Sequence, residues 1–175
     1  MRYWWVNQNQ TFRQEIEGGY LWSPKRNKNG HRNPFYEFMR EVSPGDIVFS
    51  FCDTRIAALG IVSGYCRESP KPEEFGTAGM NWSQIGWRVG VRWRRLHNAI
   101  RPKDHMARLR PELASRYAPL TQDGNGLQSV YLTNCDQLRL TVPGWWEFNS
   151  LPGHQNQKVL IVTSREVNLS LEREV

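Results

Sequence analysis

Aromatic rings and side-chain amides stand together with cations in the first half of the chain, and this combination suits nucleic-acid recognition. Trp22 and Trp82 lie beside a basic stretch and a glycine-containing stretch, outside any periodic hydrophobic pattern. An indole ring that stacks on a base contributes about 1–3 kcal/mol. Amides donate and accept hydrogen bonds, so they match the Watson–Crick edge of a base. The candidate amides are Asn7, Gln8, Asn9 and Gln10.

Three further residues complete the expected base pocket. Trp87 begins an alternating stretch, so its ring faces either the pocket or the hydrophobic core. Ser23 follows Trp22 directly. Asp53 comes just after an apolar stretch, where Asp53-Thr54 either contacts a ligand or forms a turn. For Trp87 and Asp53 the two alternatives stay open.

Cationic side chains gather in two places, and we expect them to hold phosphate groups. The chain carries 23 Lys and Arg against 17 Asp and Glu, a net charge of +6 at pH 7. Contacts between cations and phosphates give affinity and salt dependence but no base identity. The alternative is a solvated basic surface. The expected phosphate-binding residues are Lys25, Arg26, Lys28, Arg32, Arg88, Arg92 and Arg94.

The sequence lacks the motifs that catalysis or cofactor binding would need. It has no H-E-x-x-H metal motif, no phosphate-binding G-x-x-x-x-G-K loop, no G-x-G-x-x-G dinucleotide motif and no G-x-S-x-G elbow. The three cysteines show no C-x-x-C spacing, so neither a zinc site nor a disulfide framework is indicated. Asp104-His105 could be half of an acid–base pair, but an aspartate that caps a helix explains it better. We therefore expect a binding domain with no cofactor, no metal and no catalytic residue.

Length and composition indicate one folded domain. The 175 residues are 39% hydrophobic and 23% charged, which argues against a fibrous or disordered chain. The mean hydropathy is -0.65 and no run approaches about eighteen apolar residues, so we expect no membrane span. The three widely spaced cysteines suggest no disulfide framework, and we therefore expect a protein of the reducing cytoplasm. We expect a domain over residues 1–150 and an extension over 151–175 that packs on it or leads to a linker.

Short strands and short helices alternate without the regular spacing of a doubly wound sheet, which indicates a small mixed barrel of the α+β class. Asn33-Pro34 is a typical helix start, with an amide cap before proline. Trp87 to Arg94 alternates apolar and mostly cationic residues, as a half-buried strand does. The other expected strands are Tyr3–Asn7, 47–51 and 56–65; the other helices are Thr11–Glu17 and Asp104–Leu109, and 68–80 is expected to be a loop.

The order of these motifs resembles that of EVE domains, which belong to the PUA-like group together with YTH domains. The motifs are the strand Tyr3–Asn7, the segment Tyr20–Ser23, the basic loop that ends at Asn33, and the stretch from Pro44 to Phe51. Residues 81–93 are similar to the W-S-Q-x-x-W segment of YTH domains. Residues 1 to about 140 also resemble the amino-terminal module that precedes HNH nucleases in modification-dependent restriction proteins.

This resemblance implies a PUA-like small mixed β-barrel flanked by short helices, with a pocket that receives one flipped, modified base. The aromatic cage of YTH readers matches Trp22 and Trp82, with Trp87 as a third wall. The opening strand departs from YTH, where Ile-Lys-Ser follows the aromatics; here Val6 to Gln10 occupies that place.

The expected partner is double-stranded DNA with 5-methylcytosine or 5-hydroxymethylcytosine, read by the specificity module of a restriction system. Cleavage would belong to a separate nuclease domain or subunit, in a prokaryotic cytoplasm and on the nucleoid when bound. The alternatives are a reader of modified RNA or of N6-methyladenine, and an enzyme that acts on a flipped base.

Overall fold

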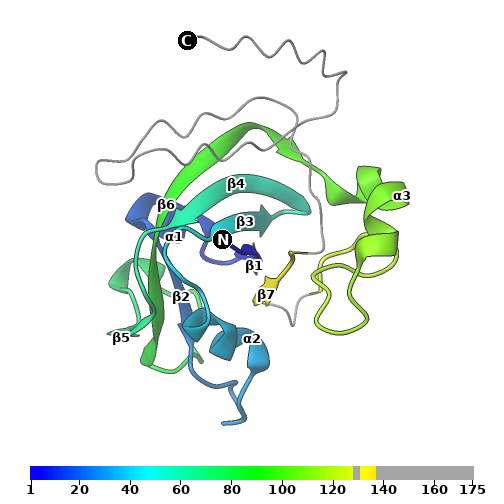
Figure 1. Ribbon diagram of the computed structural model, residues 1–175. Helices are drawn as coiled ribbons and strands as arrows, with labels where there is room; N and C mark the ends of the chain where they lie inside the picture. Colours follow the sequence, from blue (N-terminus) through cyan, green and yellow to red (C-terminus); the bar gives the residue numbers. More distant parts are fainter. Residues whose placement is uncertain (128–130, 137–175) are drawn as a thin grey trace, which may run out of the picture. The chain divides into compact units, whose positions relative to one another are not determined.

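A curved sheet of seven strands organises the part of the chain that the computed structural model describes, residues 1–127 and 131–136 (Figure 1). The strand order is β2-β6-β4-β3-β1-β7, and β5 also pairs with β6. β1 and β3 are parallel, and the other pairings are antiparallel. The strands are β1 (Tyr3–Asn7), β2 (Tyr20–Pro24), β3 (Ile47–Cys52), β4 (Arg55–Val62), β5 (Arg67–Pro70), β6 (Ile85–Ile100) and β7 (Leu132–Asn134).

The long strand β6 curls the sheet (Figure 1). Its first half pairs with β2 and β5, and its second half pairs with β4. An irregularity opposite Ile56 and Ala58 leaves additional β6 residues between the paired ones, and such bulges bend a strand. The predicted alternation is confirmed here, because Val89 and Val91 are buried whereas Arg92 is exposed.

Short helices flank the sheet. α2 begins as predicted: the side-chain oxygen of Asn33 accepts a hydrogen bond from the backbone N–H of Phe35 at 3.0 Å, and Pro34 occupies the first turn. Asp104 was expected to cap the later helix, but His105 precedes α3 and makes no side-chain cap. The helices are α1 (Phe12–Gly18), α2 (Pro34–Glu37), η1 (Phe38–Arg40), η2 (Glu73–Phe75), η3 (Pro102–His105), α3 (Met106–Leu109) and η4 (Arg110–Glu112). The α+β class with a curled mixed sheet and short helices is confirmed.

One strand was not predicted from the sequence, and one expected loop needs correction. Tyr20–Pro24 forms strand β2. All five of its residues are buried, so the sequence lacks the alternation of apolar and polar residues that marks a half-buried strand. Residues 68–80 are not a continuous loop, since they include part of β5 and all of η2.

The hydrophobic core lies on the face of the sheet that carries Trp4 and Val6. Successive strand residues point to opposite faces, so the adjacent Trp5 lies on the other side, where its ring centroid is 4.9 Å from that of Phe51. Both indoles are buried. The other buried residues of the first cluster are Leu21, Met39, Val42, Val48, Val62, Val89, Val91 and Leu132.

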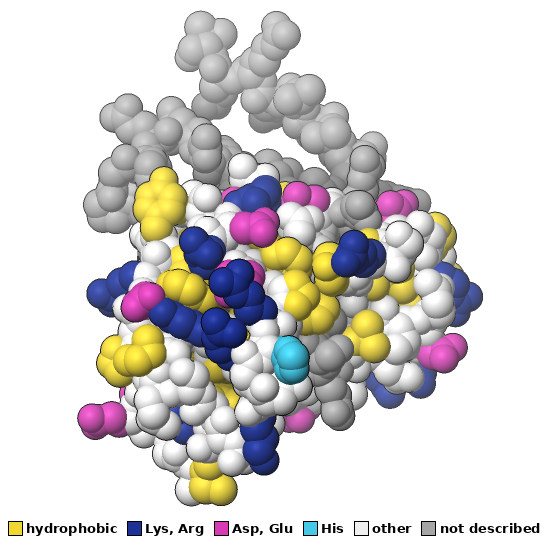
Figure 2. Space-filling view, turned by 90° about the horizontal axis from the view of Figure 1, so that it is seen from below, with side chains coloured by type: hydrophobic (Ala, Val, Ile, Leu, Met, Phe, Trp, Pro, Cys, Tyr) yellow, Lys and Arg dark blue, Asp and Glu magenta, His cyan; other side chains and the backbone are white. Residues whose placement is uncertain are grey.

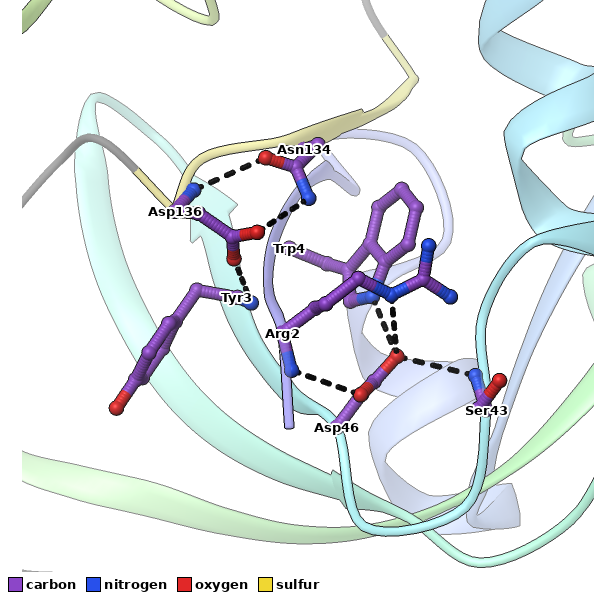
Figure 3. A network of polar contacts seen from close by, with 7 residues as sticks. All are labelled: Arg2, Tyr3, Trp4, Ser43, Asp46, Asn134 and Asp136. Carbon is purple, nitrogen blue, oxygen red and sulfur yellow. Dashed lines mark hydrogen bonds and ion pairs between the residues drawn. The ribbon is translucent and has the colours of Figure 1, made fainter.

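Buried Asp46 anchors the first strand to the turn before β3 (Figure 3). Its carboxylate accepts hydrogen bonds from the backbone N–H of Arg2 at 2.8 Å, from the Trp4 indole N–H at 2.9 Å and from the backbone N–H of Ser43 at 3.1 Å. The Arg2 guanidinium adds an ion pair at 3.5 Å. A buried carboxylate with this many partners is satisfied, so Asp46 has a structural role.

Within the described residues, no helix has the length and apolar character needed to cross a membrane. The first compact unit spans Met1–Leu138. The expected boundary at residue 150 and the extension over 151–175 lie outside the described residues.

Candidate functional site

A cavity of about 300 Å³ lies at the edge of the sheet where β1 and β3 end. Because these two strands are parallel, with Asn7 paired to Phe51, the residues that follow them meet at the same edge. Three of the predicted pocket residues line this cavity, namely Asn7, Asn9 and Asp53. The remaining lining residues are Phe51, Thr54, Arg101, Lys103, Gly124, Asn125 and Gly126.

One wall of the cavity is the two-residue turn between β3 and β4. Cys52 pairs with Arg55, and the intervening Asp53 and Thr54 have φ angles of 47° and 64°. This left-handed pair is what a tight hairpin needs, but a β-branched residue rarely adopts it. A non-glycine residue held there costs on the order of 1–3 kcal/mol. Asp53-Thr54 therefore both forms a turn and lines the cavity, and Thr54 holds backbone strain in its wall.

The amide of Asn9 is oriented by that turn. Its side-chain oxygen accepts a hydrogen bond from the backbone N–H of Asp53 at 3.0 Å. Only the oxygen of an amide can accept from an N–H, so the amino end of the Asn9 side chain remains as a donor. On the neighbouring strand end, the Asn7 amino group lies 3.5 Å from the carbonyl oxygen of Leu127.

A second wall is a tight turn that glycines bring close to Phe51. The backbone N–H of Gly124 donates to the carbonyl of Thr121 at 2.9 Å, and Gly124 has a φ of 79°. A Cβ on Gly126 would lie 2.6 Å from the Phe51 ring, which is closer than any real contact. Only glycine at position 126 allows this turn to pack on the aromatic wall.

Two cations stand beside these polar groups. Arg101 and Lys103 line the cavity, and both are exposed. Arg101 makes a 3.8 Å ion pair with Asp104, but its side chain keeps 45% of its surface exposed. Asp53 is the single carboxylate in the lining, so the wall carries a net positive charge that suits an anionic ligand.

Trp22 and Trp82 lie together, but at a different place. Trp22 is buried in a cluster with Tyr20 and Phe75, and its indole N–H donates to the carbonyl of Ser69 at 3.4 Å. The half-buried Trp82 ring stacks on it with centroids 6.2 Å apart and planes 26° apart. A base between two rings needs roughly 7 Å, twice the contact distance of about 3.5 Å. In this arrangement the two indoles pack on each other and leave no slot between them.

Trp87 cannot complete a cage with Trp22. Ser23 pairs with Trp87 in the β2–β6 ladder, and Trp22 pairs with Arg88. Directly opposite residues share a face, so Trp87 and Ser23 lie on the face opposite Trp22. The expectation that Trp22, Trp82 and Trp87 enclose one space is therefore corrected by the strand register. The Trp87 ring instead has the Lys25 ammonium at 4.4 Å and the Arg40 guanidinium at 5.4 Å from its centroid.

The buried amide of Gln8 has an internal role. Its amino group contacts the Glu15 carboxyl, and its oxygen contacts the hydroxyl of Ser50. Burial raises the pKa of Glu15 to about 8, although hydrogen bonds from Gln8, Trp22, Tyr131 and Thr11 oppose the shift. Gln10 is exposed, and the buried hydroxyl of Ser23 has no hydrogen-bond partner. Of the predicted amides, the structure brings Asn7 and Asn9 into one cavity and leaves Gln8 and Gln10 outside its lining.

The predicted phosphate-binding residues are spread over another part of the surface, and none of them lines the cavity. Lys25 contacts Glu68, the Arg26 guanidinium donates to the Gly30 carbonyl at 3.0 Å, and Arg88 lies 3.9 Å over the Tyr20 ring. Figure 2 shows one face on which Lys and Arg side chains gather beside apolar ones. The exposed members of the predicted set are Arg26, Lys28, Arg32, Arg92 and Arg94.

Sequence reasoning missed several cavity residues. Phe51 was assigned only to a strand, and Arg101 and Lys103 were passed over although they follow β6 as a short basic pair around a proline. Asn125 stands between two glycines, a pattern that indicates a turn and not a binding site. Among the residues that the structure describes, no group of His, Cys, Asp and Glu is arranged to hold a metal ion.

Comparisons with known proteins concern the fold. No protein-family model and no curated protein matches the chain. Among solved structures, it is similar to a hypothetical protein from Leishmania major at 11% identity, with a TM-score of 0.51 over 77% of this chain and 86% of that one.

Two further solved structures have lower scores. One is the YTH domain of the Zygosaccharomyces rouxii MRB1 protein in complex with N6-methyladenosine RNA, at 13% identity and TM-score 0.40 over 59% of this chain and 63% of that one. The other is the N-terminal domain of Staphylothermus marinus McrB, at 13% identity and TM-score 0.40 over 74% and 86%.

Proposed function

We propose that this chain is an EVE-type domain that binds a nucleic acid and takes one extruded base into the cavity of Asn7, Asn9 and Asp53. The proposed ligand is double-stranded DNA that carries 5-methylcytosine or 5-hydroxymethylcytosine. The observation that carries the proposal is the cavity itself, about 300 Å³ of space lined by three amides, one carboxylate, one aromatic ring and two cations.

The chemistry of the lining fits a base better than an apolar ligand. Side-chain amides and a carboxylate supply the donors and acceptors that a Watson–Crick edge requires. Phe51 offers an apolar wall, and burying an added methyl group there is worth about 0.8 kcal/mol. Turning a base out of a duplex costs a few kcal/mol. Contacts from Arg101 and Lys103 to flanking phosphates would offset part of that cost.

The proposed biological role is that of a specificity module. The order of sequence motifs that resembles EVE domains and the modules before HNH nucleases supports this role. In this role the domain recognises the modified base in the cytoplasm, and a nuclease domain or subunit cleaves the DNA. None of the cavity residues is assigned a catalytic step.

The proposal is tested by fluorescence anisotropy with duplexes that differ at one central base. The set holds cytosine, 5-methylcytosine, 5-hydroxymethylcytosine and N6-methyladenine, together with an RNA of the same sequence that carries N6-methyladenine. We expect a modified cytosine in DNA to bind most tightly. Tightest binding of the RNA or of N6-methyladenine would replace the proposed ligand, and equal affinities for all probes would contradict modified-base recognition.

Variants locate the site. We expect Asn9→Ala and the pair Arg101→Ala with Lys103→Ala to weaken binding at least about tenfold, since each removes a contact to the ligand. Arg13→Ala is the matched control, because the Arg13 side chain is 79% exposed on α1 and does not line the cavity. Unchanged affinity in the cavity variants would place the ligand elsewhere.

A further inference from the structure

Asn9 and Asp53 are neighbours of opposite hydrogen-bonding character in the cavity wall. The Asn9 oxygen is occupied by the backbone N–H of Asp53 at 3.0 Å, so its amino group is a donor. The Asp53 carboxylate is an acceptor only, and both residues line the cavity. A ligand therefore meets an acceptor beside a donor.

With the C4 substituent of a pyrimidine or the C6 substituent of a purine placed at Asp53, this pair complements one class of base edge. Cytosine presents its N4 amino donor next to the N3 acceptor, and adenine presents its N6 amino donor next to the N1 acceptor. Thymine, uracil and guanine present the reverse order, a carbonyl acceptor next to an N–H donor. Against the pair, the carbonyl oxygen would face the carboxylate of Asp53, and the ring N–H would face the amino group of Asn9. Such a mismatch leaves the polar groups of base and wall unpaired and lowers affinity.

We infer that Asn9 and Asp53 make the cavity selective for bases with an exocyclic amino group, cytosine and adenine, over their keto counterparts. This inference rests on the proposed function and names the class of base that the site takes. It also assigns the strained turn a role, since the left-handed conformation of Asp53 presents its backbone N–H to Asn9.

The experiment compares 5-methylcytosine with thymine, which differ in the amino or keto group at C4 and in the proton on N3. Each base is placed opposite an abasic site in the same duplex, so that extrusion breaks no base pair in either probe. The wild-type chain is expected to bind the 5-methylcytosine duplex at least about tenfold more tightly, as one good paired contact provides. Adenine and hypoxanthine, which differ in the same way, should show the same preference.

Two variants test the pair directly. Asn tolerates the left-handed conformation of residue 53, so Asp53→Asn keeps the turn while its amide can present either a donor or an acceptor. We expect it to reduce the preference to within about threefold. Asn9→Asp keeps an acceptor for the Asp53 N–H but loses the donor, and it should weaken binding of 5-methylcytosine at least about tenfold. Asp123→Asn is the matched control, because Asp123 is exposed and lies outside the lining.

The outcomes separate this inference from the proposed function. Tight binding of both duplexes with equal affinity, or an Asp53→Asn variant that keeps the full preference, overturns the inference alone. A preference for thymine does the same. No measurable binding of any duplex overturns both the inference and the proposed function.

Discussion

The hydroxyl of Tyr131 lies 3.2 Å from a carboxyl oxygen of Glu15 and 2.7 Å from the backbone carbonyl oxygen of Trp22. One phenolic proton cannot serve both acceptors. Burial raises the pKa of Glu15 to about 8, so the carboxyl holds a proton at neutral pH that it can donate to the Tyr131 oxygen. The contacts of the Tyr131 hydroxyl join α1, β2 and the residue that precedes β7.

The raised pKa of Glu15 makes stability depend on pH. Between about pH 4.5 and about pH 8, Glu15 keeps its proton in the folded state but has lost it in the unfolded chain. We therefore expect the free energy of unfolding to fall through this range, by at most about 1.4 kcal/mol per pH unit. Urea denaturation at about pH 5, 7 and 9 measures the slope.

Glu15→Gln is the informative variant, since it keeps a neutral polar group of the same shape. It should flatten the dependence on pH, whereas Glu112→Gln, at an exposed position, should leave the slope unchanged. The same slope in Glu15→Gln and wild type would show that another group titrates.

The aromatic cluster around Trp22 is predicted to stabilise the fold. Trp22→Ala removes a buried indole and should cost about 3–5 kcal/mol in the free energy of unfolding. Trp82→Ala should cost less, because Trp82 is half-buried. Chemical denaturation gives both values. Binding of modified DNA by folded Trp82→Ala should equal that of wild type, and its loss would move the base site to this cluster.

Asp46 is predicted to be one of the most sensitive polar positions. Asp46→Ala would leave the N–H groups of Arg2, Ser43 and the Trp4 indole without their acceptor, at a cost of about 3–5 kcal/mol. Urea denaturation measures this loss. Asp123→Ala, at an exposed site, should change stability by no more than about 0.5 kcal/mol. Similar values for the two variants would refute the anchoring role.

Backbone strain at Thr54 can be relieved by glycine. Thr54→Gly should raise the free energy of unfolding by roughly 0.5–1 kcal/mol, because glycine adopts a φ of 64° without steric cost. Gly45→Ala is the reciprocal control. Gly45 has a φ of 89° and nothing within 4 Å of an added Cβ, so its predicted loss of about 1 kcal/mol is purely conformational. Thermal unfolding of both variants measures these two changes in stability. A Thr54→Gly variant less stable than wild type would argue against backbone strain at Thr54.

Arg101 and Lys103 are predicted to contact phosphates and not base edges. Replacing either with Ala should lower the slope of log affinity against log salt by about one, while the ranking of modified bases stays unchanged. DNA titrations between about 50 and 200 mM salt measure the slope. Lys28→Ala, in the exposed loop after β2, should leave the slope unaltered. A smaller slope only in Lys28→Ala would favour the phosphate path expected from the sequence.

Most of the elements were predictable because their signals are local. Asn33 and Pro34 cap a helix through atoms two residues apart, and the alternation from Trp87 to Arg94 follows from the geometry of a single strand. The class of the fold followed from the mixture of such elements. Strand β2 was missed because both of its faces are covered, which removes the alternation that marks a strand.

The candidate site depended on contacts between distant parts of the chain. The sequence by itself determined that Asn7, Asn9 and Asp53 were polar groups next to strands. Only the parallel pairing of β1 with β3 decided that they share a cavity. The register of β2 against β6 likewise decided that Trp22 and Trp87 face opposite ways. The alternation of side chains between the two faces of a strand is a local property. Strand pairing and register are set by long-range packing, so suitable residue types alone cannot show which residues lie together.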